Sequence, residues 1–93
     1  MATVHLPRSL ALVIPDLPRV ASVEGETVGA VVAALDERWP GLADRVLEPG
    51  PAIRDHINVF VDGDRATLAT RVDEGSVVHV IPAVAGGARG RSG

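Results

Sequence analysis

The stretch best suited to chemistry lies near the end of the chain. A strand pattern leads into a proline, three small apolar residues and two glycines, namely Pro82, Ala83, Val84, Ala85, Gly86 and Gly87. Glycines lack a Cβ, so a tail that ends in two of them can enter a narrow tunnel of a partner enzyme. Pro82 fixes φ and removes an amide donor, which predicts that the strand ladder stops there. We expect the carboxyl of Gly87 to be the reactive group of this tail; a Gly-rich C-terminus without a role is the alternative.

Six more residues, 88–93, follow Gly87 and keep its carboxyl in a peptide bond. The main hypothesis is a precursor that a protease cleaves between Gly87 and Ala88. In the second interpretation, residues 88–93 are a remnant that the native protein does not contain. The third is a small Arg/Gly segment that binds RNA. It is the weakest, because two arginines are few for a chain whose net charge is −3.

Few side chains of this chain could act as catalysts. It has no cysteine, and all nine basic residues are arginine, so no side-chain thiol or amine could attack an activated carboxyl at the tail. His5, His56 and His79 lie on alternating positions of predicted strands without paired acids, which favours surface histidines over metal ligands. Asp62 and Asp64 belong to a glycine turn. We expect a protein that is not an enzyme and that holds no metal or cofactor itself.

Length and composition predict one small domain. The chain has 93 residues, of which 46% are hydrophobic, enough for one core without disulfides. Its net charge of −3 argues against nucleic acid as a partner. No apolar run approaches the about 20 residues of a membrane span, and the N-terminus lacks a signal-peptide layout. We expect a cytoplasmic protein that does not bind membranes and is a monomer when free.

Hydrophobic periodicity predicts the elements that hold the tail. Alternation indicates strands at 3–6, 19–24, 57–61 and 76–81, and a weaker edge strand at 66–68. Residues 10–14 are interpreted as further apolar packing after a turn. Thr27 as N-cap and Pro40 as stop bound one amphipathic helix, whose apolar stripe is Val28, Val31, Val32, Leu35 and Trp39. A short helical turn at 42–47 and a loop at 48–51 follow.

This order of elements predicts an α+β fold of the β-grasp (ubiquitin-like) type, in which a mixed four- to five-stranded sheet packs on one main helix. The first and last strands lie parallel at its centre. The expected core combines the helix stripe with Val4, Leu6, Val23, Ile57, Val59, Val61, Val78 and Val80.

The opposite face of the predicted sheet carries Phe60, His79 and Ile81, with His5 nearby. An exposed apolar patch of this kind often marks a partner-docking surface. The alternative is that these cross-strand pairs only stabilise the sheet.

Four segments together carry a resemblance to a known family; they are 25–32, 39–42, 57–63 and 73–87. In order and spacing they resemble the MoaD/ThiS ubiquitin-like sulfur carriers over nearly the whole chain to Gly87. The ending 80–87 and the strand 57–61 are most similar to the CysO-type carriers of cysteine synthesis. Family members typically stop at the two glycines, so the extension 88–93 departs from the pattern.

The resemblance implies a division of the chain and a cycle. Residues 1–85 are the carrier domain, 82–87 the Gly-Gly tail and 88–93 the removable extension. A MoeB/ThiF-like adenylyltransferase would use MgATP to adenylate Gly87, and sulfide would convert the adenylate into a thiocarboxylate. A sulfur-accepting synthase would take the sulfur, and a JAMM-type zinc peptidase would first remove 88–93.

The pathway stays open between several interpretations. Biosynthesis of cysteine or of a sulfur-containing natural product is the leading one. The small subunit of molybdopterin synthase is the nearest alternative. A β-grasp interaction module whose glycines are incidental is the alternative from another class of protein.

Overall fold

The computed structural model describes residues 1–82. Its strands are β1 (Ala2–His5), β2 (Val20–Val23), β3 (Leu47–Glu48), β4 (Ala52–Ile53), β5 (Ile57–Val61), β6 (Asp64–Arg65) and β7 (Val77–Pro82). Its helices are α1 (Arg8–Val13), α2 (Val28–Arg38) and α3 (Leu42–Val46). None of these helices has the length and apolar character that crossing a membrane requires.

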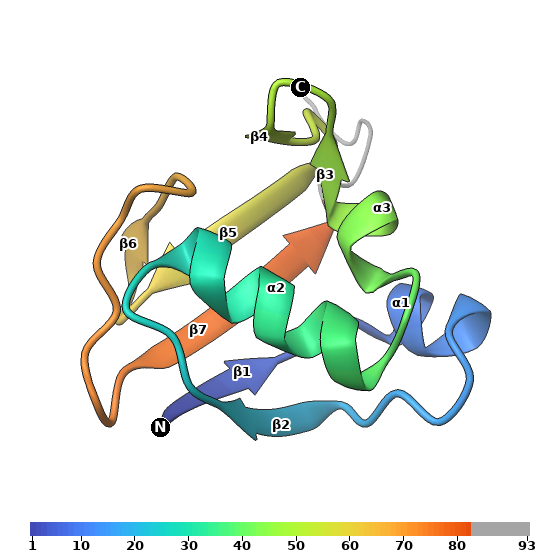
Figure 1. The fold of residues 1–93 in the computed structure, drawn as a ribbon, viewed down its shortest axis with the longest axis horizontal. Coiled ribbons are helices and arrows are strands. Elements are labelled where there is room, and N and C mark those ends of the chain that lie inside the picture. The colour runs from blue at the N-terminus through green and yellow to red at the C-terminus, as the bar shows by residue number, and fades with distance from the viewer. Residues whose placement is uncertain (83–93) are drawn as a thin grey trace, which may run out of the picture.

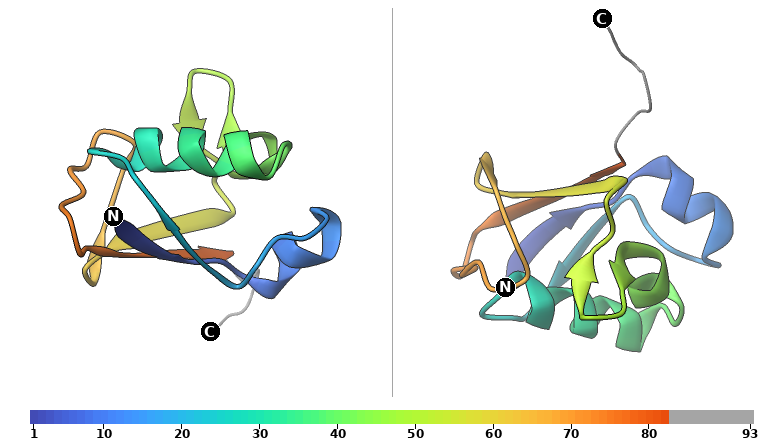
Figure 2. Two further views of the ribbon diagram at one scale, coloured as in Figure 1. Left: turned by 60° about the horizontal axis from the view of Figure 1, so that its bottom comes forward. Right: turned by 90° about the horizontal axis from the view of Figure 1, so that it is seen from above.

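Five strands form one mixed sheet in the order β2-β1-β7-β5-β6. β1 and β7 are parallel neighbours at its centre, and the other pairs are antiparallel. β3 and β4 form a separate two-stranded ladder. α2 lies across one face of the sheet, and no helix of the described part lies across the other (Figure 1, Figure 2). This arrangement confirms the predicted β-grasp fold, with five strands in the main sheet.

Helix α2 forms where the sequence supplies a cap and an apolar stripe. The Thr27 hydroxyl accepts a hydrogen bond from the Ala30 amide (3.1 Å), as an N-cap side chain does. Two further amides of the first turn donate to the carbonyls of Leu68 and Thr70 (3.0 Å each). Amides of a first turn have no partner within their own helix. The loop after β6 therefore stabilises the start of α2.

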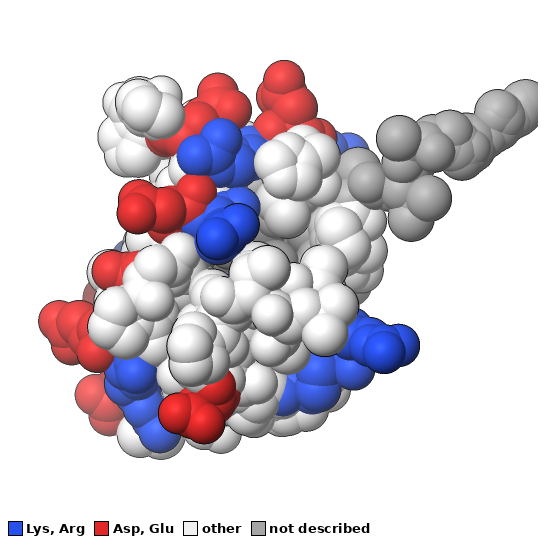
Figure 3. Space-filling view, turned by 90° about the vertical axis from the view of Figure 1, so that its right-hand side faces the viewer, with Lys and Arg blue, Asp and Glu red and all other residues white. Residues whose placement is uncertain are grey.

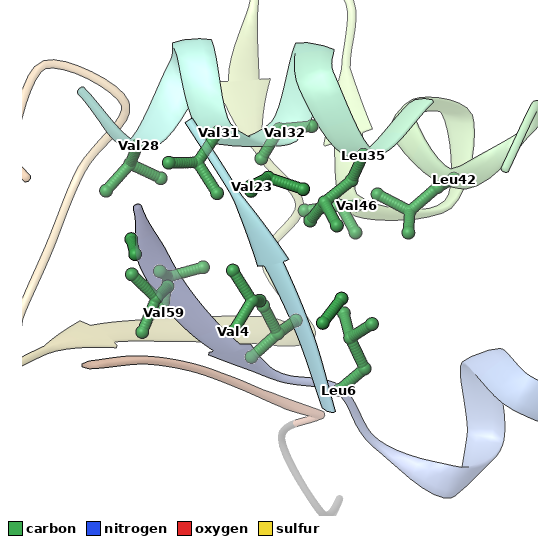
Figure 4. Close-up of a cluster of buried hydrophobic side chains, with 14 of the residues drawn as sticks. Val4, Leu6, Val23, Val28, Val31, Val32, Leu35, Leu42, Val46 and Val59 are labelled. Carbon is green, nitrogen blue, oxygen red and sulfur yellow. The ribbon is translucent and has the colours of Figure 1, made fainter. Parts of the chain in front are cut away.

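The core fills the space between α2 and the sheet (Figure 4). The helix contributes four buried side chains: Val28, Val31, Val32 and Leu35. The sheet contributes Val4, Leu6, Val23, Ile57, Val59, Val61, Val78 and Val80, all buried. Burying one such side chain contributes about 1.5–3 kcal/mol. The predicted core is confirmed, except that Trp39 at the end of the stripe is only partly buried.

Two regions contain regular structure where the sequence predicts none. Residues 10–14, interpreted as further apolar packing after a turn, lie largely within α1 and end at its C-cap Ile14, and Leu10 and Ile14 are both buried. The predicted loop at 48–51 connects the short strands β3 and β4, whose Leu47 pairs with Ile53.

The predicted edge strand at 66–68 is wrong. The edge strand is β6, which pairs with β5 directly after a two-residue turn, with Val61 opposite Asp64. The Ala66 amide still donates to the Val59 carbonyl of β5 (2.8 Å). The chain then leaves the ladder, because Ala66 is buried in the core and the carbonyl of Leu68 accepts an amide of α2. The last strand is shifted by one residue from the predicted 76–81, since β7 runs from Val77 to Pro82, which lies opposite Ile57.

Candidate functional site

The root of the predicted tail is the strand β7. It pairs with β1 on one side and with β5 on the other, so the tail continues from the middle of the sheet. Pro82, its last residue, lies opposite the buried Ile57. The remaining predicted tail residues, 83–87, and the predicted cleavage site between Gly87 and Ala88 lie outside the described residues.

The sheet face opposite α2, here called the open face, carries one row of side chains across five strands. In the strand register His5 lies opposite both Val20 and His79, and Phe60 lies opposite both His79 and Arg65. Directly opposed residues of neighbouring strands share one face of a sheet. The row from β2 to β6 therefore reads valine, two histidines, phenylalanine and arginine.

The two histidines of this row stack on each other. Their ring centroids lie 4.6 Å apart and their planes differ by 12°. Stacking of this kind fixes both imidazoles against the sheet, and both are half-buried. The sequence predicts His5 near this surface, and the structure places it in direct contact with His79.

The predicted docking residues Phe60, His79 and Ile81 lie on this open face. Ile81 is two residues beyond His79 on β7 and is 44% exposed, whereas Phe60 is half-buried. The structure thus brings the three residues together, and their role in docking stays a prediction. Docking through these residues would need a contiguous exposed apolar surface.

Sequence reasoning missed Val20, which is 51% exposed at the start of β2. The strand alternates between exposed and buried residues, with Val23 buried. An odd separation of three residues puts Val20 on the face opposite Val23. The alternation around Val23 could therefore have predicted that Val20 lies on the open face.

The third histidine does not join the other two. His56 precedes β5 and lines a shallow hollow of about 330 Å³ with Asp44, Arg45 and Arg54, beside α3. Across residues 1–82, no group of three or more His, Asp or Glu side chains is placed to hold a metal ion.

The aspartates of the predicted glycine turn have structural roles. Asp62 adopts a positive φ of 51°, and its carboxylate accepts a hydrogen bond from the Val77 amide (2.9 Å). Asp64 starts β6. The turn thereby connects the start of β7 to the end of β5. The prediction that Asp62 and Asp64 belong to a glycine turn is confirmed.

Of the charged side chains near this face, Arg65 ends the row at β6, and the exposed Arg8 and Arg19 lie beside the end of β1. The ion pair found among the described residues joins the N-terminus to Glu74 at 3.6 Å, at the other end of β1. Its carboxylate is 93% exposed, so its contribution to stability is small. The arrangement offers apolar and imidazole surface for contact, and a central strand that leads into the tail.

These features define a protein with the ubiquitin-like β-grasp fold. The sequence profile of the ThiS family matches residues 18–87. The chain belongs to this family of sulfur carriers and ubiquitin-like modifiers.

Curated relatives of the chain come from two branches of the family. It is 33% identical over 72 residues to the sulfur carrier protein CysO of Mycobacterium tuberculosis, covering 71% of this chain and 77% of the relative. It is 40% identical over 65 residues to small archaeal modifier protein 3 of Haloferax volcanii, covering 66% of this chain and 70% of the relative. These relatives are small carrier and modifier proteins.

A solved complex shows the same fold. The structure of the BexX/CysO complex of Amycolatopsis orientalis contains a chain that matches with a TM-score of 0.82 at 23% identity, covering 92% of this chain and 99% of that chain. At this level of identity the likeness concerns the fold. The complex also shows that the fold occurs bound to a partner protein.

Proposed function

We propose that this chain is a sulfur carrier whose Gly87 carboxylate, after removal of residues 88–93, is adenylated and converted into a thiocarboxylate. The observation that carries the proposal is that the ThiS family match ends at Gly87 and leaves 88–93 outside. Gly87 is five residues beyond Pro82, the last described residue of the central strand β7.

The proposed chemistry belongs to the tail and to its partner enzymes. A carboxylate oxygen of Gly87 attacks the α-phosphorus of ATP, pyrophosphate leaves and an acyl-adenylate forms. Sulfide then attacks the acyl carbon, the bond to AMP breaks, and the thiocarboxylate remains. A MoeB/ThiF-like adenylyltransferase supplies the MgATP site, so the carrier itself holds no cofactor.

The composition of the chain suits a reactive acyl group at its end. With no lysine and no cysteine, no side-chain amine or thiol of the carrier can consume its own adenylate. Five residues span at most about 18 Å when extended. That reach allows Gly87 to enter a deep active site while the folded domain stays outside.

Three kinds of partner follow from this proposal. A JAMM-type peptidase cleaves between Gly87 and Ala88. The adenylyltransferase docks on the open face around Phe60, His79 and Ile81 and takes the tail into its active site. A sulfur-accepting synthase of cysteine or natural-product biosynthesis then consumes the thiocarboxylate; a large subunit of molybdopterin synthase is the alternative acceptor.

The experiment compares three forms of the chain with the adenylyltransferase, MgATP and radiolabelled pyrophosphate. We expect pyrophosphate exchange into ATP with the chain that ends at Gly87. We expect none with the full chain, or with a chain that ends at Ala85. Exchange with the full chain would show adenylation at Gly93 and contradict processing. No exchange with the chain that ends at Gly87, by an enzyme that is active on its own carrier, would favour the interaction module.

A second candidate function is protein modification, favoured by the 40% identity to small archaeal modifier protein 3. A lysine amine of a target protein would attack the acyl carbon of the same Gly87 adenylate, the bond to AMP would break, and an isopeptide bond would form. Because this chain has no lysine, it could not form side-chain-linked polymers of itself. Incubating the activated carrier with host extract separates the two functions, since a modifier produces covalent adducts that resist reducing agents.

A further inference from the structure

The outer strand β6 covers only one end of its neighbour β5. It pairs with the last two residues of β5 alone (Figure 1). The Ala66 amide then donates to the Val59 carbonyl (2.8 Å), and the Leu68 carbonyl accepts an amide of α2 (3.0 Å). The chain has by then turned away from the sheet. The edge of β5 from Ile57 to Val59 is therefore left without a neighbouring strand.

The backbone bonds around β5 decide which groups of this stretch face outward. The Asp62 amide donates to the Val77 carbonyl of β7, whereas the Val59 carbonyl accepts the Ala66 amide on the other side. In an antiparallel ladder the residues of a strand bond alternately to one side and to the other. The N–H and C=O groups of Ile57 and Val59 therefore point away from β7.

Two of these four groups have a partner and two have none. The Ile57 amide donates to the Arg54 carbonyl (2.9 Å), and the Val59 carbonyl is taken by Ala66. Among the hydrogen bonds of residues 1–82, none involves the Ile57 carbonyl or the Val59 amide. Both residues are buried, Val59 to 1% exposure. Buried backbone groups nearly always have a partner, so we expect water or a ligand to bind these two.

The two groups belong to residues that line a hollow of about 490 Å³ at this edge of the sheet, here called the edge pocket. Its apolar lining includes Ile53 of β4, Ala66 and Leu68, together with Ile57 and Val59. Small-ligand sites have volumes of about 300–1,000 Å³, apolar walls and a few fixed polar groups. The edge pocket has all three properties.

The charges that border the edge pocket favour an anion. Arg54, Arg65 and Asp55 line it, two positive charges and one negative, whereas the whole chain carries −3. No ion pair of residues 1–82 involves either arginine. Arg54 is held by a bond from its Nε to the Asp44 carbonyl (3.1 Å), and Arg65 is exposed. An anionic acceptor at the Val59 amide would therefore meet a favourable charge.

We propose that the edge pocket binds the free C-terminal end of a partner polypeptide whose last residue is apolar. The amide of that residue donates to the Ile57 carbonyl, and its carboxylate accepts the Val59 amide and faces Arg65. One residue of a parallel strand bonds to a neighbour in this way. The added chain must end there, because Ala66 occupies the next position along β5. A terminal carboxylate fits that gap, and a continuing strand does not.

The edge pocket lies at the far edge of the sheet from α1. β6 and β2 are the two outer strands, and α1 leads into β2. Figure 3 views the molecule from the side of α1 and α3, where basic and acidic side chains are both exposed. A polypeptide end in the edge pocket leaves that side free. A second protein could therefore hold the chain while another partner contacts the α1 side.

The test is a titration of the ¹⁵N-labelled full chain with N-acetyl-alanyl-leucine, followed by the amide chemical shifts. We expect the Val59 amide proton to move downfield in a saturable way, because it gains a hydrogen bond. The matched ligand is N-acetyl-alanyl-leucinamide, which has the same side chains and no carboxylate. We expect it to bind at least about tenfold more weakly, because hydrogen bonds to an ionised acceptor are the stronger ones.

A pair of variants tests the same contact from the side of the protein. Ala69→Glu places a second carboxylate beside the ligand, since Ala69 lines the edge pocket and is exposed. Its matched control is Ala33→Glu, at an exposed position of α2. We expect Ala69→Glu to weaken binding of N-acetyl-alanyl-leucine at least about tenfold through like-charge repulsion. We expect Ala33→Glu to leave it unchanged. Melting curves show whether both variants are folded.

Other outcomes overturn the inference. An unshifted Val59 amide at millimolar N-acetyl-alanyl-leucine refutes the site. Equal binding of the acid and the amide refutes recognition of a carboxylate. A Val59 shift that follows protein concentration without ligand assigns the edge pocket to a second copy of the chain. A Val59 shift on removal of residues 88–93 assigns it to the chain's own new end at Gly87. None of these results bears on adenylation, so the proposed function is tested separately.

Discussion

Gly25 lies between β2 and α2, where the backbone passes so close to the helix that a side chain has no room. A Cβ at this position would lie 2.8 Å from the Val31 amide nitrogen, 2.9 Å from Val31 Cγ2 and 3.0 Å from the Ala30 carbonyl carbon. Two of these three atoms belong to the backbone of α2, which cannot rotate away. Gly25→Ala must therefore push the helix away from its entry loop or distort that loop.

The cost follows from the size of this overlap. Forced insertion of a methyl group into a packed site destabilises a protein by about 1–3 kcal/mol. For a domain of this size, about 2 kcal/mol lowers Tm by about 8–16 °C. Urea unfolding followed by circular dichroism measures the change in the free energy of unfolding, and a thermal scan measures Tm.

Gly29→Ala is the matched control, four residues further along and inside α2. There a Cβ would meet the Leu68 carbonyl oxygen at 3.4 Å, an ordinary contact. Alanine is also the better helix former, by up to about 1 kcal/mol. We expect Gly29→Ala to be as stable as the original chain or slightly more stable. If Gly25→Ala matched it in stability, the close approach of loop and helix would be refuted.

The other stability predictions concern caps and core. Thr27→Ala removes the N-cap of α2 and should cost about 1 kcal/mol in urea unfolding, whereas Thr27→Ser should cost much less. Asp36→Ala removes the carboxylate oxygen that accepts the amides of Gly41 and Ala43 (3.1 and 2.9 Å); we expect a loss of about 1–2 kcal/mol, and an equal stability of both chains would contradict that role. Leu35→Ala empties a fully buried site and should cost about 2–5 kcal/mol by the same measurement.

The larger elements of the fold could be predicted because their signals are strong. The stripe from Val28 to Leu35 repeats at helical spacing and has Thr27 before it. The strand Ile57–Val61 alternates strictly, and the structure buries its odd positions. These patterns also determine which face of β7 is open, so the grouping of Phe60, His79 and Ile81 followed from the sequence.

The short elements were harder to predict because their residues carry few of the usual helix and strand signals. Helix α1 has six residues, no side-chain cap hydrogen bond and no acidic residue in its first turn. Its signal was the pair Leu10 and Ile14, four residues apart and both buried. β3 and β4 have two residues each and flank a turn rich in proline and glycine, which alone indicates a loop.

The edge strand was misplaced for a different reason. Asp62 and Gly63, with φ of 51° and 92°, form the two-residue turn of a tight hairpin. Such a turn requires pairing to resume directly after it, at Asp64. The apolar residues at 66–68 suggest a strand there, although the turn places it two residues earlier. Those residues are apolar because Ala66 packs in the core and Leu68 against it.

The central claim is that the carboxyl of Gly87 becomes a thiocarboxylate. The direct measurement is the intact mass of the chain that ends at Gly87 after incubation with the adenylyltransferase, MgATP and sulfide, followed by fragmentation of the C-terminal peptide. We predict a gain of about 16 Da, from sulfur in place of oxygen, located on Gly87 and lost on alkaline hydrolysis. An unchanged mass with an enzyme that is active on its own carrier, or a sulfur located on any other residue, would contradict the account.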